Sequence, residues 1–350
     1  MRRAAELKDA DRQQLVDAID QSLAWFETRE SRKTYPVGDF KHRHAHASLF
    51  AFRELLSIKN SRTFVKRVLH EFDLYMSIGA KTSGYVQFTG YFAPQFAGSR
   101  TKDDTYRFPL YKRPVNLKTP FATRSEIDAD PAKFKLAGTE IVYLKDQFDA
   151  FVIHVNGSAK IDLPDGRSIN VGHDGTNERP YTSLGKLLIA NKAIPRDKIS
   201  MQAIRAYFQE NPGEFNGYLH QNDRYVFFRE LNEKWPLGSL GIKLTPLRSI
   251  ATDKTMFPPG AIALALTSLP TIKKKEDDPA SRSFVQYVLD QDSGGAIKSP
   301  GRVDIFIGVG KEAGEVAGQT ISKGRLIYPL LKTDRISHWL KQMKSKAGAS

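Results

Sequence analysis

The chain has 350 residues, of which 40% are hydrophobic and 26% charged, and its 53 lysine and arginine residues against 39 aspartate and glutamate residues give a formal net charge of +14. This composition is that of a folded globular protein, and the length allows two domains with cores of their own. The sequence contains no cysteine, which excludes disulfides, thiol catalysis and thiolate metal sites. The positive charge favours an anionic partner such as nucleic acid, a membrane surface or an acidic polysaccharide.

Nucleic acid and a membrane span find little support in the sequence. Basic residues are spread along the chain, and neither zinc-finger spacing nor a ribonucleoprotein aromatic motif is present, so we expect no nucleic-acid partner. The longest apolar run, residues 261–266, is far shorter than the roughly 18 residues that a spanning helix needs. The first nine residues carry positive charge with no apolar run behind them, so they are not a signal peptide, and we expect the native signal to be absent from this sequence.

The beginning of the chain is predicted to be helical. Apolar residues recur at helical spacing in three segments, residues 15–26, 49–56 and 64–72. Asp9 and Asp11 are the candidate caps of the first segment. These apolar stripes are interpreted as core faces.

Three alternating histidines, His42, His44 and His46, lie between the first two of these segments. On a strand they would share one face and could bind a metal. The neighbouring cations Lys41 and Arg43 oppose metal binding, so we expect no metal site here.

Strand signals dominate after Gly84, and the stretch to about residue 228 is expected to be mostly β. A hairpin is predicted around the turn Pro164-Asp165-Gly166. Further strands are predicted at residues 85–93, 141–144, 151–155 and 225–229. Two helices interrupt this region, one over residues 184–190 behind Thr182 or Ser183, the other over residues 200–210, which Pro212 ends.

From residue 225 the chain is predicted to form short strands and turns up to Leu331, where Pro329 indicates an edge or a bulge in the last strand. The mixed-charge run at residues 273–279 is interpreted as a solvated loop. Residues beyond Thr333 predict a short basic amphipathic helix, which we expect to pack on the body of the protein rather than on a membrane or a partner.

Residues 290–310 contain the strongest candidate for a site. Val303 and Ile305 share one strand parity and Asp304 takes the other, so Asp304 faces away from the aliphatic stripe. The nearby Gly294-Gly295 turn would allow a ligand to approach closely. The pattern by itself nevertheless favours a solvated aspartate on an edge strand.

Several separated segments of the chain resemble the membrane-bound lytic murein transglycosylase A family. The most specific match is the run from Gln291 to Lys298, followed by residues 302–306 and 312–318. The other matching segments, in chain order, are residues 89–94, 155–159, 163–166, 180–186, 200–212, 225–229, 236–240 and 244–251. The resemblance covers the chain from about Ser22 to Leu331.

Three departures from the family pattern fall at candidate groove positions. Phe92 stands where a second tyrosine is common, and Asn156 stands where glutamine is common. Glu178-Arg179 replaces a glycine-histidine pair. These departures concern substrate preference more than reaction type.

The resemblance implies a mainly β fold with flanking helices. In this family a double-psi β-barrel is interrupted by a second, small barrel-like β domain, and the glycan lies in the cleft between the two. Applied to this chain, the N-terminal helices and the barrel would occupy residues 1–94 and 225–332. The inserted domain would be residues 95–224, and residues 333–350 would form a basic tail.

The family cleaves the β-1,4 bond between N-acetylmuramic acid and N-acetylglucosamine in peptidoglycan without water, leaving a 1,6-anhydro ring. One carboxyl group suffices, because it first protonates the glycosidic oxygen and then takes the proton of the C6 hydroxyl that attacks C1. The nucleophile is tethered in the substrate, so no enzyme nucleophile is required. The resemblance and the strand parity assign Asp304 as this acid/base, with no cofactor and no metal.

The second acid, Asp292, lies in a Ser-Gly-Gly turn, where an aspartate most often caps backbone amides. We expect it to support the structure or bind substrate rather than to catalyse. The residues expected to contact the glycan are Tyr91, Thr89, Ser158, Thr245, Asp292, Lys298 and Arg229. Structural roles remain open for three of these, namely packing for Tyr91, a turn for Ser158 and a surface charge for Lys298.

Two alternative functions remain open. One is a glycoside hydrolase that uses Asp292 and Asp304 as a pair, and the other is a non-catalytic glycan-binding protein. The expected partners are peptidoglycan glycan strands, and the protein is expected to be a monomer with peripheral membrane or cell-wall association. The resemblance places it in the cell envelope, in the periplasm or at the outer membrane.

Overall fold

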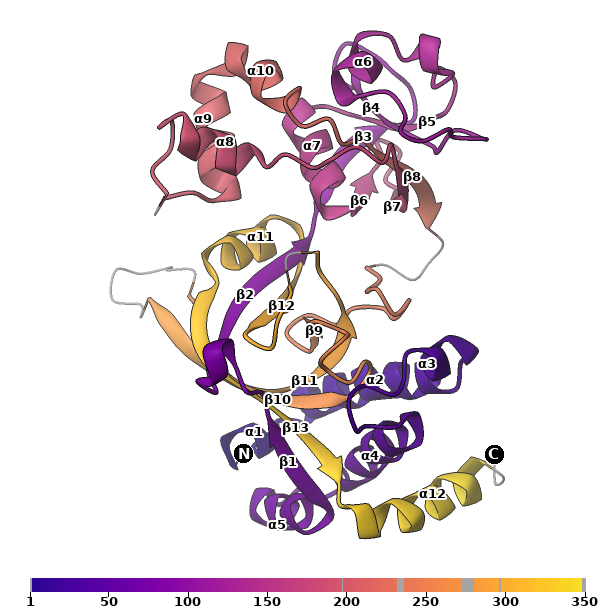
Figure 1. Cartoon of the computed structure of the whole chain (residues 1–350), viewed down its shortest axis with the longest axis vertical. Coiled ribbons are helices and arrows are strands. Elements are labelled where there is room, and N and C mark those ends of the chain that lie inside the picture. The colour runs from indigo at the N-terminus through magenta and orange to yellow at the C-terminus, as the bar shows by residue number, and fades with distance from the viewer. Residues whose placement is uncertain (1, 197, 232–235, 272–279, 296, 348–350) are drawn as a thin grey trace. The chain divides into compact units, whose positions relative to one another are not determined.

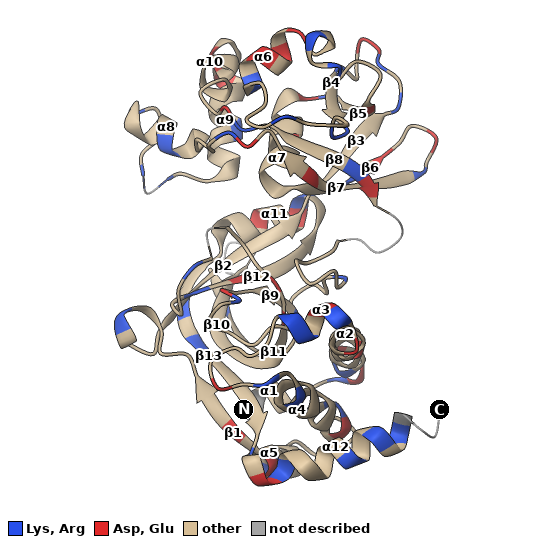
Figure 2. Ribbon diagram, turned by 45° about the vertical axis from the view of Figure 1, so that its right-hand side comes forward, with Lys and Arg blue, Asp and Glu red and all other residues tan. Residues whose placement is uncertain are grey.

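The computed structural model describes residues 2–196, 198–231, 236–271, 280–295 and 297–347, which form two compact units (Figure 1). The first unit contains residues 1–92, 237–308 and 319–350, and the second contains residues 93–236 and 309–318. The mixed-charge run at residues 273–279 lies outside the described residues. Figure 2 shows lysine and arginine distributed over both units.

A closed β-barrel forms the centre of the first unit. The strand order is β1-β13-β10-β11-β9-β12-β2, and β2 also pairs with β13, so six strands close on themselves and β1 stays at the edge. The strands are β1 (Phe72–Met76), β2 (Val86–Ala93), β9 (Ser249–Ala251), β10 (Ile262–Pro270), β11 (Ser281–Asp292), β12 (Arg302–Val309) and β13 (Ile321–Leu331). The expected barrel with a second sheet is therefore confirmed.

The barrel strands have two apolar faces. Because successive side chains on a strand point to opposite faces, Val288 and Val303 belong to one core inside the barrel, whereas Tyr287 and Leu289 belong to a second core shared with the helices. A strand in this barrel is thus buried on both sides, which explains the long apolar runs in its sequence.

The N-terminal helices cover the outer side of the barrel, as the apolar spacing predicted (Figure 1). They are α1 (Arg2–Ala5), α2 (Asp9–Phe26), α3 (Arg29–Lys33), α4 (His42–Leu55) and α5 (Ser61–Glu71), and a short 3-10 turn, η1 (Ala80–Thr82), follows β1. Asp9 and Asp11 lie in the first turn of α2, where negative charge is favourable, rather than capping it. Lys8 occupies the cap position, and its side chain makes no capping hydrogen bond.

The predicted basic helix at the end of the chain is confirmed as α12 (Thr333–Ala347). It packs against α4. Trp339 on its inner face is 8% exposed, and its indole Nε1 donates a hydrogen bond of 3.1 Å to Glu71 Oε2. The apolar face of α12 is therefore covered by the protein itself, as expected.

The three histidines lie on a helix and not on a strand, so they do not share one face. They belong to α4, in which side chains two positions apart diverge by about 200°. His42 Nε2 lies 2.9 Å from Ser31 Oγ, whereas His44 Nε2 donates to the carbonyl of Leu331 at 2.7 Å. In the part of the chain that the structure describes, no group of three histidine or acidic residues could hold a metal ion.

A six-stranded sheet forms the centre of the second unit, in the order β4-β5-β3-β6-β7-β8. Its strands are β3 (Gln95–Ser99), β4 (Phe108–Tyr111), β5 (Glu140–Leu144), β6 (Ser158–Asp162), β7 (Ser168–Thr176) and β8 (Val226–Leu231). The predicted hairpin is confirmed, since β6 and β7 pair antiparallel around Gly166. A parallel bridge between Lys112 and Phe228 brings the two ends of the sheet toward closure.

The second unit is more helical than expected. It contains α6 (Arg124–Ala129), α7 (Gln147–Asn156), α8 (Leu184–Ala190), α9 (Met201–Glu210) and α10 (Phe215–Leu219), with 3-10 turns η2 (Ala132–Phe134) and η3 (Pro212–Glu214). Helices α8 and α9 were predicted, and Ser183 and Ser200 cap them. The six-stranded sheet agrees with the predicted β character, whereas α6, α7 and α10 were not predicted.

The predicted strand at residues 151–155 is in fact part of α7. Asp146 caps this helix by accepting the backbone N–H of Phe148 at 2.7 Å, and Gly157 ends it with a φ of +76°. The apolar run was misleading because α7 is buried on several sides and packs against β4, β5 and β6. An apolar run on a buried helix cannot be told from a strand by periodicity.

Two features near the boundary between the units also differ from the prediction. Residues 225–231 belong to the second unit, because β8 pairs with β7, so the chain returns to the first unit near Leu237 rather than at Tyr225. Residues 310–319 form a helix, α11 (Gly310–Gln319), where strands and turns were expected. None of the helices in the described ranges has the length and apolar character of a bilayer-spanning segment.

A buried ion pair connects three strands of the barrel. Asp290 on β11 is fully buried and pairs with Lys254. Its Oδ2 also accepts hydrogen bonds from the hydroxyls of Thr252, which follows β9, at 2.8 Å and of Tyr328 on β13 at 2.7 Å. Burial raises the pKa of Asp290, and the charge of Lys254 opposes this rise.

Replacing Lys254 by methionine keeps the length of the side chain but leaves the Asp290 carboxylate buried without its cation. We expect the free energy of unfolding of Lys254→Met to fall by about 3–5 kcal/mol, as measured by urea denaturation. Lys323→Met, at an exposed lysine of β13, is the matched control and should change stability by less than about 0.5 kcal/mol. Equal losses in the two variants would contradict the role of the ion pair.

Candidate active site

Asp304 lies on β12, opposite Ala251 of β9 in the antiparallel register. Its side chain is half-buried. Oδ1 is inaccessible to solvent and accepts no hydrogen bond from any described residue. A buried carboxylate oxygen without a donor is costly when charged, so this position favours the protonated acid.

The electrostatic surroundings of Asp304 act in the same direction. Burial raises the pKa of Asp304 to about 6. The nearby positive charge of Arg302 opposes this rise, and the negative charge of Asp292 contributes to it. A carboxyl group with this pKa can donate a proton near neutral pH and can take one back.

Asp292, the last residue of β11, has a different environment. Its Oδ1 accepts the backbone N–H groups of Ser239 at 2.7 Å and of Ser293 at 2.8 Å. Its Oδ2 accepts the hydroxyl of Tyr91 at 2.8 Å. These three donors fix the orientation of the Asp292 carboxylate.

Tyr91 connects Asp292 to the strand that carries Asp304. It lies on β2, and the centre of its ring is 5.3 Å from that of Phe306 on β12. Burial and the charge of Asp292 raise the pKa of Tyr91 well above its ordinary value, so the phenol stays protonated and donates. Tyr91 thus packs on Phe306 and donates to Asp292, and its contact with the glycan stays a prediction.

Arg302 is a candidate site residue because its charge acts on Asp304, and the sequence did not single it out. Its Nη2 donates to Thr89 Oγ1 at 3.3 Å, and the Thr89 hydroxyl in turn lies 3.5 Å from the carbonyl of Val303. The signal was present, because residues two apart on a strand share a face and Arg302 therefore lies beside Asp304.

Thr245 and Lys298 belong to the same unit, but no described hydrogen bond links either of them to Asp292 or Asp304. Thr245 forms a turn before β9, in which its N–H donates to Ser249 Oγ at 2.8 Å. Lys298 is exposed. The N–H of Ser299 lowers the pKa of Asp253, and the charge of Lys298 contributes.

Ser158 and Arg229 belong to the second unit. Ser158 begins β6, and Arg229 lies on β8; both are paired with Gly172 of β7, one from each side. Arg229 is 64% exposed, and its Nε is 3.8 Å from Asp174 Oδ1. The predicted residues are thus divided between the two units, with Ser158 and Arg229 beside Gly172 in the second and the others in the first.

Comparison with known proteins identifies relatives over most of the chain. Residues 87–229 match the MltA specific insert domain, and residues 248–329 match the 3D domain. The chain is 32% identical over 256 residues to membrane-bound lytic murein transglycosylase A of Escherichia coli (strain K12). The matched region is 73% of this chain and 68% of that protein.

Solved structures agree with these matches. The structure of E. coli MltA with bound chitohexaose has a TM-score of 0.73 at 27% identity and covers 90% of this chain and 89% of its own. The lytic transglycosylase LtgG of Burkholderia pseudomallei has a TM-score of 0.62 at 29% identity and covers 91% of this chain and 89% of its own.

The raised pKa of Asp304 predicts a pH-dependent difference in stability between the wild type and Asp304→Asn. Between pH 4 and 6, Asp304 is deprotonated in the unfolded chain but still protonated in the folded chain. The wild type therefore loses stability as the pH rises through this range, whereas the asparagine variant does not. At pH 7 we expect Asp304→Asn to be more stable by about 2 kcal/mol, allowing for the exposed part of the side chain.

Urea denaturation at pH 4 and at pH 7 measures this difference. Asp104→Asn, at an exposed aspartate, should show none. A variant that is less stable than the wild type at pH 7 would contradict the raised pKa.

Proposed function

Because the chain belongs to the family of membrane-bound lytic murein transglycosylase A and is a lytic transglycosylase of peptidoglycan, we propose that Asp304 is the single acid/base of its reaction. The observation that supports this most strongly is the half-buried carboxyl group whose Oδ1 has no described hydrogen-bond partner. Its pKa of about 6 suits both halves of the reaction.

The reaction would proceed in two proton transfers through Asp304. The carboxylic acid first donates its proton to the glycosidic oxygen between N-acetylmuramic acid and N-acetylglucosamine, and the bond to C1 breaks. The resulting carboxylate then accepts the proton of the C6 hydroxyl while that oxygen bonds to C1. The proton count balances, and the products are a free hydroxyl and a 1,6-anhydro ring, so no water enters.

Asp292 would support this reaction rather than share it. A hydrolase of the two-carboxylate type needs a second acid that is free to act as nucleophile or to activate water. The carboxylate of Asp292 already accepts three hydrogen bonds. The negative charge of Asp292 instead raises the pKa of Asp304 and so helps to keep Asp304 protonated. The hydroxyl of Tyr91 holds the Asp292 carboxylate in place.

The positive charge of Arg302 would oppose the effect of Asp292 on the pKa of Asp304. A cation near Asp304 stabilises the carboxylate that forms when the proton leaves, so the pKa stays close enough to neutrality for the proton to be exchanged. Thr89 orients Arg302 through its hydroxyl.

The glycan contacts are proposed for Tyr91, Thr89, Asp292, Thr245 and Lys298 in the first unit. Ser158 and Arg229 are proposed as contacts in the second unit. The bound chitohexaose in the E. coli relative supports a glycan as the ligand. The relatives are named membrane-bound, and we place the action of this protein at the cell envelope, in the periplasm or at the outer membrane, as a peripherally associated monomer.

Digestion of purified sacculi followed by mass spectrometry tests the assignment of Asp304. The wild type should release anhydromuramyl products, and Asp304→Asn should release none, because the amide can neither donate nor accept the required proton. Asp104→Asn is the matched control and should keep full activity. Persistent anhydro products in Asp304→Asn would disprove the assignment, and reducing-end products from the wild type would favour the hydrolase.

The pH profile of cleavage tests the role of Asp292. In the wild type the rate should fall about tenfold per pH unit above pH 6, since only the protonated acid starts the reaction. Removal of the Asp292 charge lowers the pKa of Asp304, so Asp292→Asn should move this descending limb to lower pH while the products stay anhydro. A complete loss of cleavage at every pH would instead indicate that Asp292 is the second catalytic acid.

A further inference from the structure

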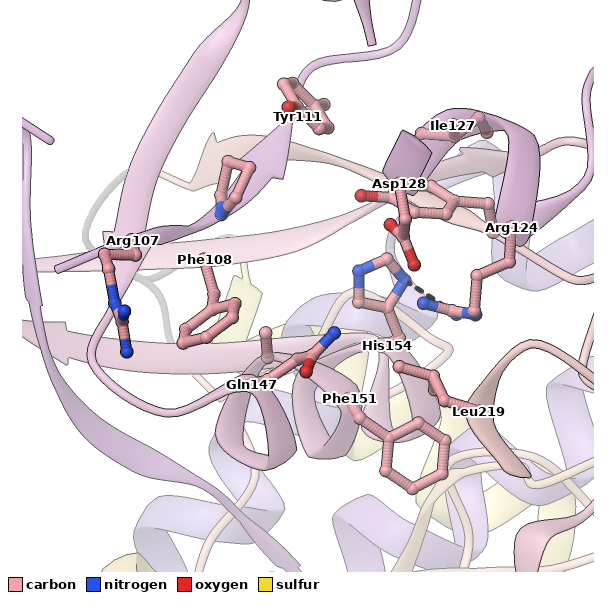
Figure 3. Close-up of a pocket in the computed structure, with 13 residues that line it drawn as sticks. Arg107, Phe108, Tyr111, Arg124, Ile127, Asp128, Gln147, Phe151, His154 and Leu219 are labelled. Atoms are coloured by element: carbon pink, nitrogen blue, oxygen red, sulfur yellow. Dashed lines mark hydrogen bonds between the residues drawn. The ribbon is translucent and has the colours of Figure 1, made fainter. Parts of the chain in front are cut away.

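A pocket of about 210 Å³ lies within the second unit (Figure 3). None of the residues proposed above for the reaction or for the glycan lines it. Aromatic side chains of Phe108, Tyr111, Phe151 and Tyr225 contribute much of its wall. Its polar groups come from α6 and α7, from Arg107 just before β4, and from the hydroxyls of Tyr111 and Tyr225.

His154 on α7 presents a hydrogen-bond donor to this pocket. The residue is 8% exposed. Its Nδ1 accepts the backbone N–H of Val226 at 3.2 Å and lies 3.4 Å from the donor Arg124 Nη2. Because Nδ1 accepts, the ring proton is on Nε2, and no described residue bonds to Nε2. Burial and the charge of Arg124 hold the pKa of His154 well below its ordinary value, so the ring is neutral.

Asp128 on α6 provides an acceptor beside this donor. Figure 3 shows its carboxylate next to the imidazole of His154 and near the guanidinium of Arg124. The side chain is 27% exposed, and Oδ2 lies 3.2 Å from His220 Nε2. The buried Arg124 is already engaged, since it donates to the carbonyls of Asn222 and Arg224. It therefore balances the charge of Asp128 rather than offering a free cation.

Gln147, at the start of α7, provides a second acceptor. Its Nε2 donates to Asn216 Oδ1 at 2.9 Å, which leaves the amide oxygen without a described donor. The pocket thus offers one neutral N–H donor, a carboxylate, an amide oxygen and the exposed guanidinium of Arg107 against aromatic walls. Asp128 and Arg107 bring opposite charges to the lining, so neither an anion nor a cation meets one sign of charge alone, and the set suits an uncharged ligand with hydroxyl and amide groups.

The volume restricts the ligand further. Pockets for drug-sized molecules usually measure about 300–1,000 Å³, so this one holds a single small ring. A sugar ring presents an apolar face to aromatic side chains and hydroxyl groups to polar ones.

We propose that this pocket binds one N-acetylated aminosugar residue, such as the end of a glycan strand. His154 Nε2–H donates to the acetamido carbonyl, Gln147 Oε1 accepts the acetamido N–H, and Asp128 accepts ring hydroxyls. The choice of this sugar among neutral rings rests on the proposed function. The expectation of a small uncharged ring rests only on the residues that line the pocket.

Nuclear magnetic resonance of the full chain with ¹⁵N-labelled histidine tests the proposal. Asp304→Asn serves as the background so that no cleavage occurs, and His154→Gln identifies the His154 signal by its loss. Added N-acetylglucosamine should shift the His154 Nε2–H signal with millimolar affinity. The double variant Asp128→Asn and Gln147→Leu should weaken this affinity about tenfold or more. Asp104→Asn, the control, should leave it unchanged.

Three outcomes would overturn the proposal, namely no shift of the His154 signal, an equal shift with glycine, or full affinity in the double variant. Gln147→Leu alone changes a half-buried side chain at the first residue of α7, so it provides a folded test if the double variant is unstable, and it too should lose affinity. Anhydro products from the wild type without a His154 shift would disprove the pocket alone. A His154 shift without anhydro products would disprove the proposed reaction alone.

Discussion

The ion pair between Asp290 and Lys254 is the constraint on which the barrel and its site depend. A carboxylate in the core is tolerated only if its charge and lone pairs are satisfied, and here Lys254, Thr252 and Tyr328 supply the partners. These partners bring β9, β11 and β13 together. Asp292 follows two residues after Asp290, and the N–H of Thr252 donates to its carbonyl at 3.2 Å. Asp292 is thus held beside a network whose carboxylate, Asp290, is fully buried.

Within the barrel, Asp292 and Asp304 differ in their hydrogen-bond partners. Asp292 accepts three hydrogen bonds, whereas Asp304 has a buried oxygen without a described donor and a raised pKa. Two carboxyl groups that differ in this way fit the proposed division between a supporting carboxylate and a proton carrier. Tyr91 couples them, because its hydroxyl bonds to Asp292 while its ring packs on Phe306 of β12.

The second unit shows how a misjudged element can hide chemistry. A strand at residues 151–155 would have made His154 one side chain in an ordinary sheet. In α7, His154 instead lies among Arg124, Asp128 and the aromatic wall of the pocket. Nothing in the local sequence distinguishes these possibilities, because an apolar run on a buried helix lacks the one-sided periodicity of a surface helix.

The sequence by itself determined the elements whose signals are local. Ser183, Ser200 and Gly166 mark helix starts and a hairpin turn through their own side chains or backbone freedom, and the parity of β12 placed Asp304 on its own face. Only the tertiary structure decided α7, α11, the closure of the barrel and the state of each acid. The hydroxyl that binds Asp292 comes from Tyr91, 201 residues away. A pKa depends on burial and on charges brought together by folding, and no spacing along the chain records them.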